Sequence, residues 1–281
     1  MSSTGNGAAG TGSAGNGPVI LLSYVYSQAE HVQDALAVGT TLACTSSTGI
    51  VPLCMAAAET WRRIEGSSGS AGSAGQVMSR LAASSIRGLV TVQLTAILAG
   101  TGRTRWCELA TAPPDAADAF LQVFPHTAFV CVHRSCLDVV REGAQASPWG
   151  LHGQGFAPYL LPDPGNTVAA LAAYWAHSTQ QLLAFEAANP ATTHRIRYED
   201  MDDHPSGALA VLRTSLGLAT GAGRAAPEPP GPSTAASPAA EAGVPVELIP
   251  GPLRALIADL HTELGYPPLQ EAAPGLRASP G

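Results

Sequence analysis

The stretch FPHTAFVCVHRSCLDVVREG, from Phe124 to Gly143, together with RIRYED from Arg195 to Asp200, indicates the fold of this chain. In each stretch a short apolar run typical of a buried strand ends in polar residues that lead into a predicted helix. This order of elements places anion-binding groups at the carboxyl ends of parallel strands. The two stretches therefore predict a site for a phosphate or sulfonate group at one edge of a sheet.

The remaining sequence alternates predicted strands with predicted helices, which favours an α/β fold in which a parallel sheet is flanked by helices in three layers. We expect strands at Pro18–Tyr24, Thr40–Cys44, Trp106–Leu109, Thr127–Val132 and Thr193–Tyr198. We expect helices at Ser27–Val38, Val51–Ile64, Val77–Ser84, Pro114–Val123, Leu137–Glu142, Thr167–Ala188, Pro205–Leu218 and Leu253–Leu264. The segment Leu89–Ala99 fits a strand or a buried helix, and its periodicity does not decide between them.

One domain is expected for the 281 residues, and it spans residues 18–268. The ends, residues 1–17 and 269–281, are predicted to be disordered tails because they lack a periodic apolar pattern. Residues 65–76, rich in Gly and Ser, and residues 220–243, rich in Pro, Ala and Gly, are predicted to be flexible loops.

The charge composition limits the partners of the chain. All 14 basic residues are arginines, so guanidinium groups, backbone N–H groups and hydroxyls are the groups left to hold an anion. The net charge of −7 and the scattered arginines exclude the basic stripe that a nucleic-acid partner requires.

The apolar and cysteine patterns indicate the cellular location of the protein. The sequence suggests no apolar run of the roughly 18–20 residues that a membrane span needs, so no membrane partner is expected. Five cysteines in apolar contexts indicate reduced thiols rather than disulfides, and no pattern of metal-ligand spacing accompanies them. We expect a cytoplasmic protein without a bound metal.

Three stretches resemble the sulfotransferase superfamily, whose members take a sulfonate group from 3′-phosphoadenosine 5′-phosphosulfate. They are Phe124–Val140, Arg197–Met201 with the following Pro205 and Leu212–Leu218, and Trp106–Glu108, which is similar to the family's W-x-E-K-T-P strand end. The resemblance covers roughly residues 18–268 and implies a P-loop-like sulfotransferase architecture. It also implies that this nucleotide is the co-substrate.

The resemblance implies a set of donor-binding residues. Arg134 takes the place of the arginine that binds the 3′-phosphate, and Tyr198 takes the place of a tyrosine near the adenine. Glu142 stands where the family usually has a serine that helps to bind the same phosphate.

The family's 5′-phosphosulfate loop, P-x-S-G-T-T, corresponds to residues 23–30. It contributes Tyr26, Ser27 and Gln28 as donor-binding candidates. Tyr26 stands where the family has a basic residue, and the glycine and the threonines are replaced.

Sulfonate transfer needs a group that accepts the proton of the acceptor, and two side chains are candidates. Glu108 at a predicted strand end is the leading base, and its structural alternative is a solvated carboxylate or an ion pair with Arg105. His133 is the second candidate, because imidazole titrates near neutral pH. Its alternative is a packed, hydrogen-bonded histidine at a strand end.

Structural alternatives also exist for the donor-binding candidates. Arg134 could pair with Asp138 four residues on, Tyr198 could be strand core, and Ser27 could be the N-cap of the first helix in a capping box with Glu30.

The function expected is transfer of a sulfonate group to a hydroxyl or amine of a small metabolite, in the secondary metabolism of a bacterium. A catalytically inactive sulfotransferase-like binding protein is the alternative. A P-loop kinase is disfavoured because the sequence has no G-x-x-x-x-G-K-[ST] motif. The chain is also compatible with a homodimer.

Overall fold

The computed structural model describes residues 17–46, 48–67, 73–111, 115–147, 151, 155–203, 205–218 and 244–269. The expected tails at residues 1–16 and 270–281 and the expected loop at 220–243 lie outside the described residues. Of the expected loop at residues 65–76, only residues 68–72 lie outside them.

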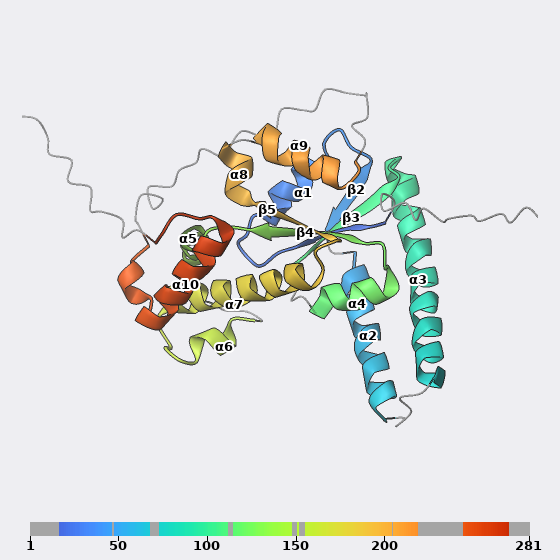
Figure 1. Ribbon diagram of the computed structural model, residues 1–281, viewed down its shortest axis with the longest axis horizontal. Helices are drawn as coiled ribbons and strands as arrows, with labels where there is room; N and C mark the ends of the chain where they lie inside the picture. The colour runs from blue at the N-terminus through green and yellow to red at the C-terminus, as the bar shows by residue number, and fades with distance from the viewer. Residues whose placement is uncertain are drawn as a thin grey trace, which may run out of the picture.

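A sheet of five parallel strands forms the centre of the molecule (Figure 1). The strands are β1 (Val19–Leu22), β2 (Leu42–Ser46), β3 (Arg105–Ala110), β4 (Ala128–His133) and β5 (Thr193–Arg197), and their order across the sheet is β2-β3-β1-β4-β5. The expected strands are therefore confirmed to within a few residues at their ends. Because all strands run the same way, their carboxyl ends meet at one edge of the sheet.

Helices cover both faces of this sheet. They are α1 (Ala29–Ala37), α2 (Ile50–Ser67), α3 (Ser73–Thr101), α4 (Asp115–Val123), α5 (Cys136–Ala146), α6 (Ala157–Leu160), α7 (Thr167–Ala188), α8 (Tyr198–Asp203), α9 (Pro205–Ser215) and α10 (Gly251–Leu264), with a 3₁₀ turn at Val246–Leu248. In Figure 1, α1, α8 and α9 lie on one side of the sheet, and α2, α4 and α7 lie on the other. The three-layer α/β fold is confirmed.

Two hydrophobic clusters fill the spaces between the layers. The β1 residues alternate between them: Ile20 and Leu22 face the cluster with Trp175 of α7, whereas Val19 and Leu21 face the one with Leu36 of α1. Both faces of a central parallel strand are thereby buried, and this explains its continuous apolar run.

The segment between α2 and β3 differs from the expectation. One helix, α3, replaces the predicted Val77–Ser84 helix and the undecided Leu89–Ala99 segment, and α2 continues to Ser67. Residues 65–67 and 73–76 of the expected flexible loop are thus helical. An apolar run can satisfy its backbone in a helix or in a strand, so composition alone did not separate the two.

Helix α3 also carries an apolar stretch that the sequence analysis did not recognise. Arg80–Thr101 is long and apolar enough to cross a membrane; an 18-residue window within it has a mean hydropathy of 1.5, and 6% of that window is buried inside the molecule. A single helix of this kind is weak evidence for a membrane span, because core helices and signal sequences share these properties.

Candidate active site

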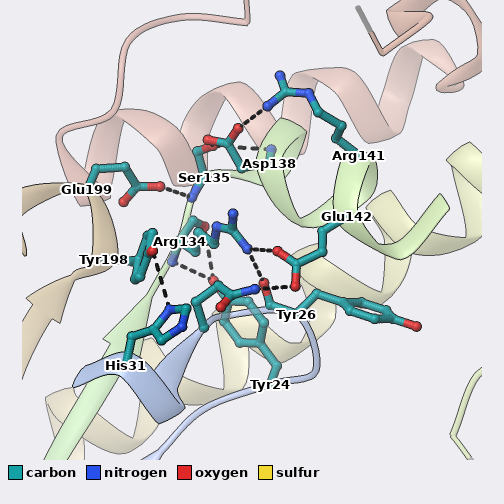
Figure 2. A network of polar contacts seen from close by, with 11 residues as sticks. Tyr24, Tyr26, His31, Arg134, Ser135, Asp138, Arg141, Glu142, Tyr198 and Glu199 are labelled. Carbon is teal, nitrogen blue, oxygen red and sulfur yellow. Dashed lines mark hydrogen bonds and ion pairs between the residues drawn. The ribbon is translucent and has the colours of Figure 1, made fainter. Parts of the chain in front are cut away.

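Arg134 follows the last residue of β4 and lies at the centre of a polar network (Figure 2). Its Nη1 atom donates to the carbonyl oxygen of Tyr26, 2.8 Å away, and to the carboxylate of Glu142. Its guanidinium carbon lies 5.0 Å from the centre of the Tyr198 ring, within the range of a cation–π contact. The site predicted at this edge of the sheet thus contains a guanidinium with its side chain 14% exposed.

Glu142, in α5, forms an ion pair with the guanidinium of Arg134. One carboxylate oxygen accepts from Arg134, and the other accepts from the side-chain amide of Gln28. Figure 2 shows Glu142 pointing toward the guanidinium. The residue that replaces the family's serine is therefore itself the partner of the arginine.

The loop after β1 contains Tyr26, Ser27 and Gln28, three of the predicted donor-binding residues. Tyr26, through its backbone carbonyl, and Gln28, through its side chain, take part in the network around Arg134. The side chain of Tyr26 turns away from Arg134, and its hydroxyl lies 3.4 Å from the hydroxyl of Ser147. Both Tyr26 (φ 68°) and Gln28 (φ 61°) adopt the left-handed conformation, which is strained for residues other than glycine.

The expectation that Ser27 caps the first helix is wrong. Helix α1 begins at Ala29, its N-cap residue is Gln28, and no side chain makes a capping hydrogen bond. Ser27 is buried, 2% exposed, and its backbone N–H donates to the carbonyl of Tyr24. The left-handed backbone of Gln28 sets the start of this helix, and a capping-box pattern does not reveal that conformation.

The backbone of Arg134 is held by two aromatic side chains that the sequence analysis missed. The hydroxyl of Tyr24 accepts from the Arg134 N–H at 2.9 Å and donates to its carbonyl at 3.0 Å. The indole of Trp175 in α7 donates to the same carbonyl at 2.8 Å and lies 3.1 Å from the Tyr24 hydroxyl. Burial raises the pKa of Tyr24, so its hydroxyl keeps its proton.

Glu199 ties the start of α5 to the C-terminal part of the domain. One carboxylate oxygen accepts from the backbone N–H of Ser135 at 2.7 Å, and the other accepts from the hydroxyl of Tyr266 at 2.9 Å. Burial raises the pKa of Glu199. Tyr198 is the first residue of α8 rather than the end of β5, and its hydroxyl lies 3.5 Å from His31.

The alternative ion pair between Arg134 and Asp138 is not formed. Asp138 instead binds Arg141 and the hydroxyl of Ser135, the N-cap of α5. The guanidinium of Arg134 instead binds the carboxylate of Glu142 and the carbonyl of Tyr26.

Glu108 lies within β3, two residues before its end, rather than at the end of the strand as expected, and its side chain is on the same face of the sheet as Trp106. It is 2% exposed, so the expected alternative of a solvated carboxylate is wrong. The Thr48 hydroxyl donates to its carboxylate and also accepts from the N–H of Ile50 at the start of α2. Arg105 donates to the backbone carbonyls of Gly17 and Leu216, so the expected alternative of a Glu108–Arg105 pair is wrong. Burial raises the pKa of Glu108, which suits a carboxylate that takes up a proton.

His133 is fully buried, and its Nε2 atom lies 2.8 Å from a carboxylate oxygen of Glu186 in α7. The other oxygen of Glu186 binds Arg195 of β5. Burial acts to raise the pKa of Glu186, but the hydrogen bonds from His133 and Arg195 outweigh it and lower that pKa. This arrangement favours the structural alternative for His133 over proton transfer to a substrate.

In the described part of the chain, no three His, Cys, Asp or Glu side chains gather as metal ligands would. The five cysteines are free thiols, and all except Cys44 are buried.

Comparison with known proteins decides the family. A family model described as the sulfotransferase family matches residues 40–221, well over half of the chain. The chain belongs to the sulfotransferase family. No match is found among curated proteins.

Three solved structures resemble this sulfotransferase over 90% of its length. They are the sulfotransferase domain from the curacin biosynthetic pathway (TM-score 0.55, 16% identity, 98% of that chain), the sulfotransferase domain from the Synechococcus PCC 7002 olefin synthase (0.52, 14%, 96%) and a sulfotransferase from Alicyclobacillus acidocaldarius (0.52, 8%, 97%). At such low identities the likeness shows a shared fold. Both the family and the fold class predicted from the sequence are confirmed.

The family match includes most candidate residues of this sulfotransferase but not its first loop. Arg134, Glu142 and Glu108 lie within the matched residues, whereas Tyr26 and Gln28 precede residue 40. In place of the lysine of the W-x-E-K-T-P pattern, the sulfotransferase has Leu109, which packs in a hydrophobic cluster. The chain thus departs from the family pattern at the first loop, at this strand end and at Glu142.

Proposed function

We propose that this sulfotransferase transfers a sulfonate group from 3′-phosphoadenosine 5′-phosphosulfate to a hydroxyl or amine of a small metabolite. The observation that carries the proposal is the Arg134 guanidinium at the carboxyl end of β4, already paired with an anion and stacked on Tyr198. A guanidinium that holds a carboxylate has the geometry and charge to hold a phosphate.

The donor fits the remaining groups only in part. Gln28 makes no side-chain capping hydrogen bond at the start of α1, which leaves the N–H groups of Ala29 and Glu30 for a 5′-phosphosulfate, whereas the N–H of His31 already donates to the carbonyl of Gln28. As long as the carboxylate of Glu142 is paired with Arg134, its negative charge repels a 3′-phosphate at the same place. The donor site in this proposal therefore forms when Glu142 moves.

In the proposed reaction the acceptor oxygen forms a bond to sulfur while the bond between sulfur and the oxygen of the nucleotide phosphate breaks. The acceptor proton passes to the carboxylate of Glu108, and the negative charge remains on the departing nucleotide. Because Glu108 is 2% exposed beneath Thr48, an acceptor reaches it when the start of α2 opens.

The similar solved structures support the proposed class of acceptor. Two of the similar structures are domains of a biosynthetic pathway and of an olefin synthase, and this supports a small-metabolite acceptor. Five free cysteines, four of them buried, support the cytoplasm, a reducing compartment, as the proposed location.

An inactive sulfotransferase-like binding protein is the second candidate, and the pairing of Glu142 with Arg134 favours it. Isothermal titration with 3′,5′-diphosphoadenosine, the desulfonated donor, tests the nucleotide site. Release of this product from the donor, measured against a panel of small alcohols and amines, tests catalysis. Binding without turnover across the panel supports the inactive protein, and absence of any nucleotide binding refutes the proposed function.

A further inference from the structure

Glu142 is the only side chain in the described network that binds Arg134 and Gln28 at once. Arg134 belongs to the proposed 3′-phosphate site, and Gln28 is the N-cap residue of α1, at the proposed 5′-phosphosulfate loop. These three side chains, which we call the Arg134–Glu142–Gln28 latch, therefore join the two halves of the proposed donor site.

In the latch, the guanidinium of Arg134 is already bound to a carboxylate. Its Nη1 atom is shared between the Tyr26 carbonyl and Glu142, and one face of the guanidinium lies over Tyr198. A phosphate placed on the same guanidinium would lie beside the Glu142 carboxylate, and like charges at that separation repel. Phosphate and Glu142 therefore compete for one cation.

The latch also constrains the first loop. Gln28 holds a left-handed backbone at φ 61° while its side-chain amide donates to Glu142. Release of Glu142 removes this hydrogen bond, so Gln28 becomes free to rearrange around an anion at the start of α1.

We infer that Glu142 is a specificity-determining residue that competes with the 3′-phosphate of the donor for Arg134. The wild-type protein then gains little affinity from a 3′-phosphate, because the new interaction of the phosphate with Arg134 is offset by the loss of the Arg134–Glu142 ion pair. The inference rests on the proposed function, since it concerns the same nucleotide site.

The test compares two nucleotides, 3′,5′-diphosphoadenosine and adenosine 5′-monophosphate, by isothermal titration calorimetry. The ratio of their dissociation constants isolates the contribution of the 3′-phosphate. The variants are Glu142→Ser, which is too short to reach Arg134 and restores the residue of the family pattern, and Glu142→Gln, which keeps the size and removes the charge. Thermal melting and circular dichroism check that each variant is folded.

We expect Glu142→Ser to increase the preference for the 3′-phosphorylated nucleotide by roughly ten- to hundredfold, the scale of a hydrogen bond between charged groups. Glu142→Gln should increase it less, because the amide oxygen still accepts from Arg134.

The matched control is Glu263→Gln, which removes the same charge from an exposed residue of α10 that belongs to none of the proposed donor-binding segments. It should leave the preference within about twofold of wild type, because surface charges are screened by salt. In the double variant Arg134→Ala/Glu142→Ser the gain should disappear, since the effect acts through Arg134.

Two failures are distinguishable. If Glu142→Ser leaves the ratio of the two dissociation constants unchanged, or if Glu263→Gln changes it as much, the competition is refuted while the proposed function stands. If neither nucleotide binds any folded variant, the proposed function is refuted and the inference with it.

Discussion

Replacing Tyr24 by phenylalanine removes one oxygen atom from the support of the proposed nucleotide site. The hydroxyl of Tyr24 accepts from the Arg134 N–H and donates to the Arg134 carbonyl, and the residue is 3% exposed. In the variant the carbonyl keeps its hydrogen bond from Trp175, whereas the N–H loses the partner that the structure gives it. The main cost is therefore one backbone donor left without its partner in the interior.

Such a donor costs about 1–3 kcal/mol, so we expect the free energy of unfolding to fall by about 2 kcal/mol. For a domain of this size, that corresponds to a decrease of about 4–8 °C in Tm. Urea denaturation followed by circular dichroism measures the first quantity, and differential scanning calorimetry measures the second.

Tyr174→Phe is the matched control, because the Tyr174 hydroxyl accepts from the backbone N–H of Val25 in the same loop but at a more exposed place. Water can replace that partner, so we expect a loss of less than about 0.5 kcal/mol. Equal losses in the two variants would refute the argument that burial makes the Tyr24 hydroxyl important. A Tyr24→Phe protein as stable as wild type would show that the Arg134 backbone does not depend on it.

Three further predictions concern charged residues of the site and the core. In a Glu142→Ser background, where no carboxylate competes for the guanidinium, Arg134→Ala should weaken binding of 3′,5′-diphosphoadenosine by about ten- to hundredfold. Arg141→Ala in the same background, which removes a guanidinium paired with Asp138 of its own helix, should change binding little, and calorimetry that finds equal losses would exclude Arg134 as the phosphate ligand. Glu108→Gln should slow turnover without changing nucleotide affinity. Because burial raises the pKa of Glu108 and a base works deprotonated, wild-type turnover should increase with pH through a value above about 4.3, and a flat pH–rate profile would exclude it as base. Glu186→Gln should lower the free energy of unfolding at pH 7 by about 2 kcal/mol, because His133 loses a charged partner. The pKa of Glu186 is lowered in the fold, so this loss should shrink as the pH falls below about 4, and urea denaturation at pH 7 and pH 3 that gives the same loss would contradict the assignment.

The strands and the position of Arg134 at the carboxyl edge of the sheet were predictable from local sequence. Apolar runs of strand length, such as residues 128–133, have few alternatives to a buried parallel strand, and a polar residue that follows one lies at the carboxyl edge of the sheet. Arg134 was placed at that edge for this reason, and the structure has it there.

The partners of these residues were not predictable in the same way. Glu186 lies 53 positions from His133, and Gln28 lies 114 positions from Glu142. A histidine at a strand end looks the same in sequence whether it faces a substrate or a buried carboxylate. Only the packing of α7 on β4 separates the two cases.

The amino-acid pattern by itself determined the α/β class, the family and the edge of the sheet at which a guanidinium is presented, because these depend on periodicity and on short motifs within single elements. The tertiary structure decided what that guanidinium binds: the left-handed Gln28 presents its side-chain amide to α5, and the carboxylate of Glu142 binds both Gln28 and Arg134. Pairings of this kind depend on the relative placement of distant elements, which no local pattern encodes.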